Sequence, residues 1–318
     1  MLRSCLLGGG RAARSSVLQR PFSAPTFSSS IFTPTPEHQA LRDLVRKFAE
    51  EHVAPQALAH NRSETFNLPL FRRLGDLGLL GLTADPALGG SGLDAPAVCI
   101  VHEELAAVDP AFCLSYLAHS LLFVNNLNVN GSAAQRAAFL PRACSGQHLC
   151  GMAMSEPGAG TDVLAMGTRA VRDGSDYVLS GRKMWITNGA ASAGELGDAF
   201  LVYARDAEPA AGKARSHSLF LVEKGMPGFS LGQIIKDKCG MRASNTTELV
   251  LEDVRVPAAT HLVRGWERPG ACAPSFFPRP PFFWGGGFPP FPHFSHPPFS
   301  LPPPLARRWG TRATLCCT

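Results

Sequence analysis

The chain has 318 residues, of which 45% are apolar and 17% are charged. This composition allows a sizeable hydrophobic core and excludes a wholly disordered chain. Every apolar run falls short of the roughly eighteen residues that a membrane-spanning helix needs, so we expect no membrane protein. The net charge of +5 is uneven, because residues 1–36 and 265–318 each carry +4 and residues 37–264 carry −3. A mildly acidic body predicts no nucleic-acid partner.

The nine cysteines are an odd number without any C-x-x-C pair. This pattern favours neither a disulfide framework nor a zinc site, and we predict no metal. Small buried side chains in a reducing compartment are the simpler interpretation. The cysteines are Cys5, Cys99, Cys113, Cys144, Cys150, Cys239, Cys272, Cys316 and Cys317.

The two ends of the chain differ from its body. Residues 1–30 are rich in Arg and Ser and contain no acid, which is typical of an organelle transit peptide. We expect a mitochondrial transit peptide there, with a retained N-terminal arm as the alternative. Residues 265–318 are rich in Pro and Phe and lack any helical or strand period. We expect a disordered tail, with a polyproline ligand around Pro289 as the alternative.

Residues 31–146 are expected to form a helical domain. Between Glu37 and Val53 the apolar residues recur at the spacing of one buried helix face, and Pro55 is expected to end that helix. Ser132 is a suitable N-cap for the last helix. The expected helices are Glu37–Val53, Leu70–Leu80, Ala95–Val108, Pro110–Leu127 and residues 133–143.

Residues 147–264 show a period of two, which indicates strands. Asp173-Gly174 has the composition of a hairpin turn. Short strands without helices between them predict an antiparallel barrel or sandwich. The expected fold class is therefore α+β, with a helical domain followed by an antiparallel β-barrel domain. The expected strands are His148–Met154, Thr168–Val171, Asp176–Leu179, Ala199–Ala204, Ser218–Val222 and Glu248–Val256.

Two segments could carry chemistry. Gly158-Ala159-Gly160 is half of a dinucleotide fingerprint, but Val163 replaces its third glycine and no helix is expected after it. A Gly-rich turn with hydroxyls can still cradle an anion, and a plain tight turn is the alternative. Trp185 could cover a flat ring, although a core tryptophan before a turn is the commoner meaning.

Six segments in order resemble one protein family. Ala153–Asp162, Lys183–Asn188, Val222–Phe229, Gly240–Thr246 and Glu252–Pro257 resemble the motifs of the acyl-CoA dehydrogenase family. Upstream, Leu114–Ser120 is similar to the isovaleryl-CoA dehydrogenase branch in particular. The resemblance covers residues 37–264, in the helical and the β region alike.

The resemblance implies an FAD site. Main-chain N–H groups and hydroxyls of the first segment would meet the flavin and its pyrophosphate, and the second segment would flank the ring. Thr161 would also touch the acyl-CoA substrate. The implied cofactor-binding residues are Met152, Ala153, Met154, Ser155, Glu156, Pro157, Gly158, Ala159, Gly160, Thr161, Trp185, Ile186 and Thr187.

The resemblance also implies an activity, α,β-dehydrogenation, in which a carboxylate removes the α-proton while the β-hydride moves to flavin. The implied substrate is a short or branched acyl-CoA, such as isovaleryl-CoA from leucine catabolism. An electron-transferring flavoprotein would receive the electrons, and the mitochondrial matrix would be the location.

The chain departs from the family pattern after Arg264. The family's catalytic glutamate, several FAD contacts and most tetramer contacts lie in a C-terminal helical bundle, which we expect to be absent. Glu267 lies in no matching motif, so no catalytic residue is nominated. Two hypotheses stay open: a dehydrogenase cut short by a splicing or gene-model error, and a truncated isoform without turnover. A binding module formed by the tail is a third.

Overall fold

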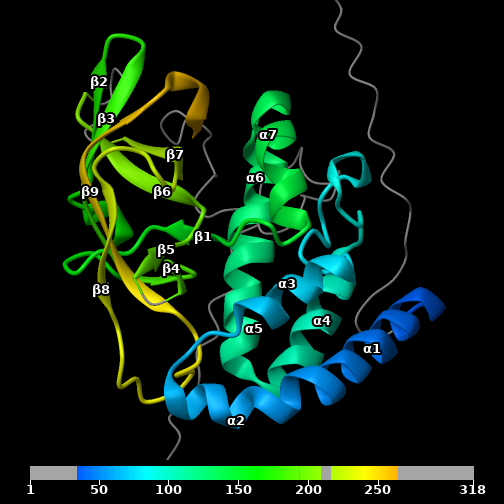
Figure 1. Cartoon of the computed structure of the whole chain (residues 1–318). Helices are drawn as coiled ribbons and strands as arrows, with labels where there is room; N and C mark the ends of the chain where they lie inside the picture. Colours follow the sequence, from blue (N-terminus) through cyan, green and yellow to red (C-terminus); the bar gives the residue numbers. More distant parts are fainter. Residues whose placement is uncertain (1–33, 193, 209–215, 264–318) are drawn as a thin grey trace, which may run out of the picture. The chain divides into compact units, whose positions relative to one another are not determined.

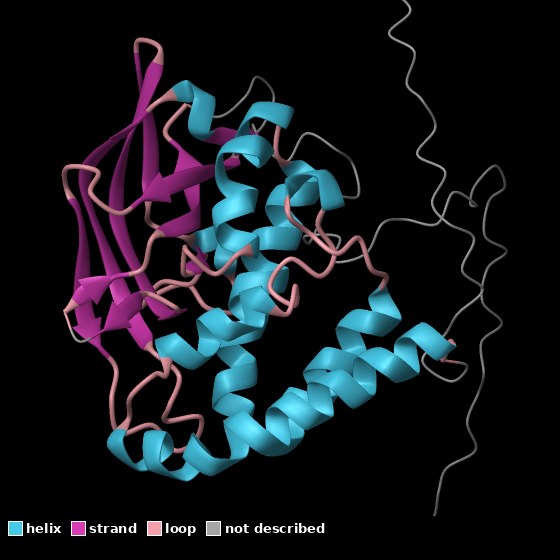
Figure 2. Cartoon of the chain, turned by 45° about the vertical axis from the view of Figure 1, so that its right-hand side comes forward, coloured by secondary structure: helices cyan, strands magenta, loops and turns pink. Residues whose placement is uncertain are grey.

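Helices precede strands along the chain, as the change of period predicts (Figure 1). The computed structural model describes residues 34–192, 194–208 and 216–263, all within one unit of the chain. The expected transit peptide and the Pro/Phe tail therefore lie outside the described residues. Figures 1 and 2 both show the strands gathered on one side and the helices on the other.

The first helix continues past its expected end. Helix α1 (Pro36–Phe48) begins at Thr35, whose hydroxyl accepts the N–H of His38 at 3.3 Å. A π-helical turn (Ala49–Val53) leads into α2 (Ala54–Ser63). The prediction that Pro55 ends the helix is wrong, because Pro55 lies in the first turn of α2. A proline has no N–H to donate. In the first turn after a π-helical turn this costs little, because an N–H there would have no regular helical acceptor.

The remaining helices largely confirm the prediction. Helix α4 has the expected bounds, and the carboxylates of Asp94 and Asp109 cap it and the next helix. Ser132 caps α7 together with Gln135, as expected. Helix α3 ends earlier than predicted, since Gly78 turns the chain at φ +71°. These helices are α3 (Leu68–Asp76), α4 (Ala95–Val108), α5 (Pro110–Leu117), a π-helical segment (Ala118–Asn125), α6 (Asn126–Asn130) and α7 (Ala133–Cys144).

The strands form one eight-stranded sheet and one small two-stranded sheet within the described residues. The order of the larger sheet is β10-β7-β6-β2-β3-β9-β8, and β1 also pairs with β6. The strands are β1 (Cys150–Ala153), β2 (Arg169–Asp173), β3 (Asp176–Thr187), β4 (Ala190–Ser192), β5 (Glu195–Leu196), β6 (Ala199–Asp206), β7 (His217–Glu223), β8 (Phe229–Ile234), β9 (Thr246–Val256) and β10 (His261–Val263).

The expected antiparallel barrel is wrong, since the larger sheet is mixed and open, with β10 and β8 at its edges. Strand β7 occupies one side of β6, and β1 and β2 share the other side, both parallel to β6. Alternating burial reveals which face a side chain occupies. It does not reveal the direction of the neighbouring strand, so the prediction missed this parallel pairing.

Strand β3 is three times as long as predicted. It begins after the expected hairpin turn, where Asp173 pairs with Asp176 and Gly174 has φ +63°. It then continues to Thr187 through two irregularities in its pairing with β9, one at Gly181 and one after Lys183. The prediction ended this strand early, because Arg182 and Lys183 interrupt its apolar alternation.

A shared core joins the helices to the sheet. One cluster of buried residues includes Leu127 and Leu140 of the helices together with Leu201 and Leu221 of the strands. Fully burying one such leucine contributes roughly 1.5–3 kcal/mol. Asn188 adds polar contacts across the same boundary, so the end of β3 is fixed against the helices.

Two further expectations concern membrane-spanning helices and cysteines. Among the described residues, no helix combines the length and apolar character that crossing a bilayer requires. Cys113, Cys144 and Cys150 are buried free thiols, as expected, whereas Cys239 is exposed.

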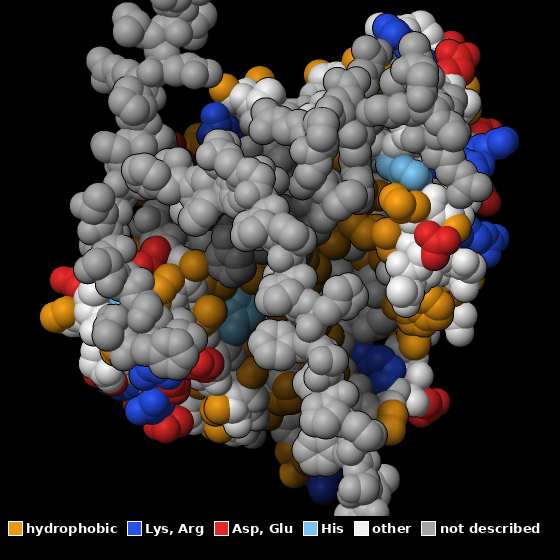
Figure 3. Space-filling view, turned by 180° about the vertical axis from the view of Figure 1, so that it is seen from behind, with side chains coloured by type: hydrophobic (Ala, Val, Ile, Leu, Met, Phe, Trp, Pro, Cys, Tyr) orange, Lys and Arg blue, Asp and Glu red, His pale blue; other side chains and the backbone are white. Residues whose placement is uncertain are grey.

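On the face opposite to that of Figure 1, hydrophobic side chains gather near the middle and most charged ones lie nearer the edges (Figure 3).

Candidate functional site

The polar turn predicted at residues 155–161 follows β1 directly. The main-chain groups of Glu156 and Ala159 bond each other at 3.0 and 3.1 Å, and Pro157 and Gly158 between them are exposed. A Cβ added to Gly158 or Gly160 would meet nothing within 4 Å. The turn therefore has open space beside its main chain, and a polar or anionic ligand can approach it.

A buried ion pair lies beneath this turn. The ammonium of Lys183, which is 0% exposed, donates to Glu156 Oε1 at 2.8 Å and to the carbonyl of Met154 at 3.0 Å. The Glu156 carboxylate also accepts the N–H groups of Gly167 at 2.6 Å and Thr168 at 2.9 Å. The side chain of Glu156, a predicted site residue, thus points into the protein.

The two charges depend on each other. Burial raises the pKa of the Glu156 carboxyl, but Lys183 and the main-chain donors outweigh it, so this pKa lies below its usual value. Burial lowers the pKa of the Lys183 ammonium, while Glu156 acts in the opposite direction. Removing either partner would leave the other as an uncompensated buried charge.

Trp185 lies at a bulge near the end of β3. The register of β3 against β9 shifts between Lys183 and Ile186, and Trp185 takes φ +62° with 53% of its surface exposed. A large aromatic residue at positive φ is rare, and such strain is concentrated at functional sites. The N–H of Met184 donates to the carbonyl of Ser155 at 2.9 Å. The bulge and the turn are therefore neighbours.

The predicted site residues fall into two groups. The Met184–Ser155 bond shows that the two predicted segments lie side by side. The side chains of Ala153, Glu156, Ala159 and Ile186 are buried, so a ligand outside could reach only their main-chain atoms. Those with partly or fully exposed side chains are Met152, Met154, Ser155, Pro157, Thr161, Trp185 and Thr187.

Asn188 was missed as a site residue, although it ends one of the motifs. It is buried at φ +65°, and its amide donates to the carbonyls of Ser115 at 2.9 Å and Cys150 at 3.0 Å. Its own N–H donates to Asn245 Oδ1 at 3.1 Å. Asn188 thus fastens the end of β3 to helix α5, to β1 and to the segment before β9.

His119 fixes the start of β1 and was also missed. Its Nδ1 accepts the N–H of Cys150 at 3.1 Å, and its Nε2 donates to the carbonyl of Ala143 at 3.0 Å. Burial lowers the pKa of His119 to about 4, so the ring is neutral at physiological pH. The segment Leu114–Ser120 was the available clue, because it resembles a family motif and contains both His119 and Ser115.

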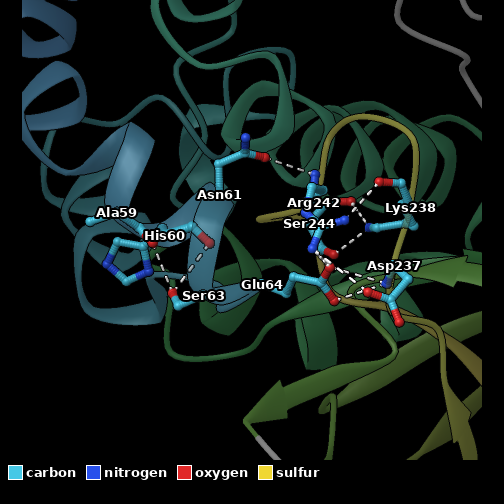
Figure 4. A network of polar contacts seen from close by, with 9 residues as sticks. All are labelled: Ala59, His60, Asn61, Ser63, Glu64, Asp237, Lys238, Arg242 and Ser244. Carbon is cyan, nitrogen blue, oxygen red and sulfur yellow. Dashed lines mark hydrogen bonds and ion pairs between the residues drawn. The ribbon is translucent and has the colours of Figure 1, made fainter. Parts of the chain in front are cut away.

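The segment between β8 and β9 is held on helix α2 by polar contacts (Figure 4). Glu64 accepts the N–H of Asp237 at 3.0 Å and forms an ion pair with Arg242, whose N–H donates to Asn61 Oδ1 at 3.1 Å. Nearby, Lys238 donates to Ser244 and to Thr246 at the start of β9, and burial lowers the pKa of this ammonium. A third motif, Gly240–Thr246, is thereby fixed to the helical region.

A helical region followed by this mixed sheet is an established architecture. Residues 35–147 match the family model for the acyl-CoA dehydrogenase N-terminal domain, and residues 151–254 match the model for the middle domain of the same family. The chain belongs to the acyl-CoA dehydrogenase family.

Individual relatives agree with this assignment. The chain is 44% identical over 248 residues to the mitochondrial isovaleryl-CoA dehydrogenase of Pongo abelii, covering 77% of this chain and 57% of that protein. Its structure resembles a glutaryl-CoA dehydrogenase of Mycobacterium smegmatis in complex with FADH2, with a TM-score of 0.67, 32% identity and coverage of 73% and 57%. The butyryl-CoA dehydrogenase of Megasphaera elsdenii gives a TM-score of 0.67, 32% identity and coverage of 73% and 60%. The chain thus spans little more than half the length of these relatives.

Proposed function

We propose that this chain binds FAD and serves the α,β-dehydrogenation of a short or branched acyl-CoA. The observation that carries this proposal is the pairing of an open main-chain turn with a strained, exposed tryptophan at the end of β3. A diphosphate needs N–H donors with space beside them, and a flavin needs a flat apolar cover. Residues of this chain fit both parts of the cofactor.

The proposed contacts follow from what is exposed. Main-chain groups of Met152–Thr161 and the hydroxyls of Ser155 and Thr161 would hold the cofactor, and Thr161 would also contact the CoA. Trp185 would cover the ring, with Ile186 contributing main chain and Thr187 a hydroxyl. Open space at Gly158 and Gly160 supports this close approach.

FAD supplies a hydride acceptor when it is bound. The residues of this chain would orient the cofactor and exclude water from one side of it. We nominate no general base, because each buried carboxylate of the described residues is already engaged. Glu104 pairs with Arg42 and Arg46, Asp109 caps a helix, Glu156 pairs with Lys183, and Glu248 pairs with Arg182.

The substrate, partner and location are parts of the same proposal. Similarity to mitochondrial isovaleryl-CoA dehydrogenase supports isovaleryl-CoA as substrate and a mitochondrial location, which the proposal narrows to the matrix. The family resemblance supports an electron-transferring flavoprotein as the electron acceptor. Coverage of only 57% of that relative leaves the inactive isoform as the competing proposal.

Flavin spectroscopy on the purified full chain tests the proposal. The chain is mixed with FAD, freed of unbound cofactor, and exposed without oxygen to isovaleryl-CoA, butyryl-CoA or glutaryl-CoA. We expect saturable FAD binding and loss of visible absorbance that is fastest with isovaleryl-CoA. Bound FAD that no acyl-CoA bleaches would assign the inactive isoform, and a chain that binds no FAD would refute the proposed function.

A further inference from the structure

We propose that Glu156 and Lys183 are positioning residues, which hold the turn 155–161 and the Trp185 bulge in the one geometry that binds the cofactor. The claim that this geometry binds the cofactor rests on the proposed function. The claim that the pair orders the turn and the bulge can be measured without any ligand. Neither side chain would touch the cofactor, because both are buried.

All three N–H directions of the Lys183 ammonium are used. They lead to Glu156 Oε1 at 2.8 Å, to the Met154 carbonyl at 3.0 Å and to the sulfur of Met166 at 3.8 Å. An ammonium has three donors and no other polar group, so its geometry is fully determined by these partners. Strand β3 is thereby tied to the end of β1 and to the segment that precedes β2.

Glu156 completes the connection from the turn itself. Its two carboxylate oxygens accept from Lys183, from Gly167 and from Thr168. The turn cannot rotate about its base without breaking these charged hydrogen bonds, which are about twice as strong as neutral ones. The pair therefore joins four main-chain segments: the end of β1, the turn, residues 166–168 and β3.

Stability alone does not explain a charge pair at this place. Replacing a buried ion pair by apolar residues of similar size is often neutral or stabilising, because both charges lose their hydration. A pair that brings little net stability but restricts geometry is what a binding site requires, since preorganisation reduces the cost of binding. The bulge that exposes Trp185 begins directly after Lys183.

The test uses a neutral pair of similar shape. In the full chain, Lys183→Met with Glu156→Gln removes both charges, while the single glutamine oxygen can still accept from Thr168. The matched control, Asp173→Asn with Arg255→Met, removes an exposed ion pair that also joins β9 to the β2–β3 hairpin. Lys183→Gln with Glu156→Gln, a neutral pair whose side chains can still hydrogen-bond each other, serves as a second variant in case the first does not fold.

Three quantities are measured: the thermal midpoint, amide hydrogen exchange without ligand, and Kd for FAD. We expect the neutral pair to keep a midpoint near that of the original chain. Exchange should accelerate at residues 155–161 and 184–187 but not in β6 or β7. The Kd should rise roughly tenfold, the change that corresponds to about 1.4 kcal/mol of binding free energy. The control pair should change neither exchange nor Kd.

Two results overturn the inference: unchanged exchange at both segments, or faster exchange with an unchanged Kd. A chain that binds no FAD before any substitution refutes the proposed function instead. The exchange data then decide by themselves whether the pair orders the turn and the bulge.

Discussion

An ion pair lies near each end of strand β3, but one pair is exposed and the other is buried. Near the hairpin, Tyr177, Val178 and Leu179 pair regularly with β9, and the charges of Asp173 and Arg255 lie in solvent. Near the other end, the register shifts, a tryptophan takes positive φ, and the charges are buried. Each half pairs with β9, so the sheet itself does not cause the difference.

This contrast distinguishes structural charges from charges that organise a site. An exposed pair is screened by water and salt and contributes little to stability. A buried pair is expensive to desolvate, but it restricts the directions its partners can take. The strained end of β3 is therefore expected to be sensitive to substitution and to pH, whereas the hairpin end should tolerate both.

Removing Lys183 alone should have the largest effect. The substitution Lys183→Met leaves Glu156 as a buried carboxylate without a counter-charge, at an expected cost of about 3–5 kcal/mol of unfolding free energy. Urea unfolding at neutral pH measures it. A loss that recovers at acidic pH, where the orphan carboxyl takes up a proton, would identify the unpaired charge as its cause. A variant as stable as the original chain would contradict the account.

Acid should lower the free energy of unfolding through His119, which lies beside β1. Burial lowers the pKa of His119 from 6.5 to about 4, so below pH 6.5 the unfolded chain binds a proton that the folded chain does not. Stability from this group is complete above pH 6.5 and is lost as pH falls toward 4, by about 3 kcal/mol in all. The stability of His119→Gln, measured across this window, should show a shallower slope. Equal slopes would exclude His119 as the group responsible.

Glycine at position 189 should be required for steric reasons. A Cβ there would lie 1.8 Å from Thr247 Oγ1, whereas a Cβ on Gly158 meets nothing within 4 Å. We expect Gly189→Ala to cost about 1–3 kcal/mol of unfolding free energy, as overpacking does, and Gly158→Ala to cost far less. Thermal unfolding compares the two. Adding Thr247→Ala to Gly189→Ala should restore part of the loss, and no recovery would count against this clash.

The exposed pair at the hairpin should have the smallest effect. Arg255→Met removes contacts to Asp173 and Asp176, and all three side chains have surface in solvent. We expect no resolvable change in the thermal midpoint at physiological salt, because water screens both charges. A loss as large as that of Lys183→Met would remove the distinction between the two halves of β3.

Local chemistry explains which parts of the fold were predictable. Helices α4 and α5 begin as predicted, because the carboxylates of Asp94 and Asp109 accept N–H groups of their first turns. Helix α7 likewise follows from Ser132 and Gln135. The π-helical turn before Pro55 was not predictable from periodicity, since five residues are too few to distinguish its period from that of an α-helix.

The sheet and the site depended on contacts between distant residues. Lys183 falls on the same face as the buried Tyr177 and Leu179, but a lysine is rarely buried without a counter-charge, and its partner Glu156 lies 27 positions earlier. The roles of Asn188 and His119 depend on where α5 meets β1, which no local pattern reveals. The turn and the tryptophan segment were identified by family resemblance, whereas the inward direction of Glu156 came only from the structure.

The central claim is that the strained end of β3 and the neighbouring turn form a flavin site. An equilibrium titration of the purified full chain with FAD, followed by flavin fluorescence, tests it most directly. The account predicts saturable binding of one FAD per chain, weakened by the neutral Glu156–Lys183 pair and unaffected by the Asp173–Arg255 control. Absence of binding by the original chain would contradict the flavin site, and equal affinity in all three proteins would contradict the positioning role of the buried pair.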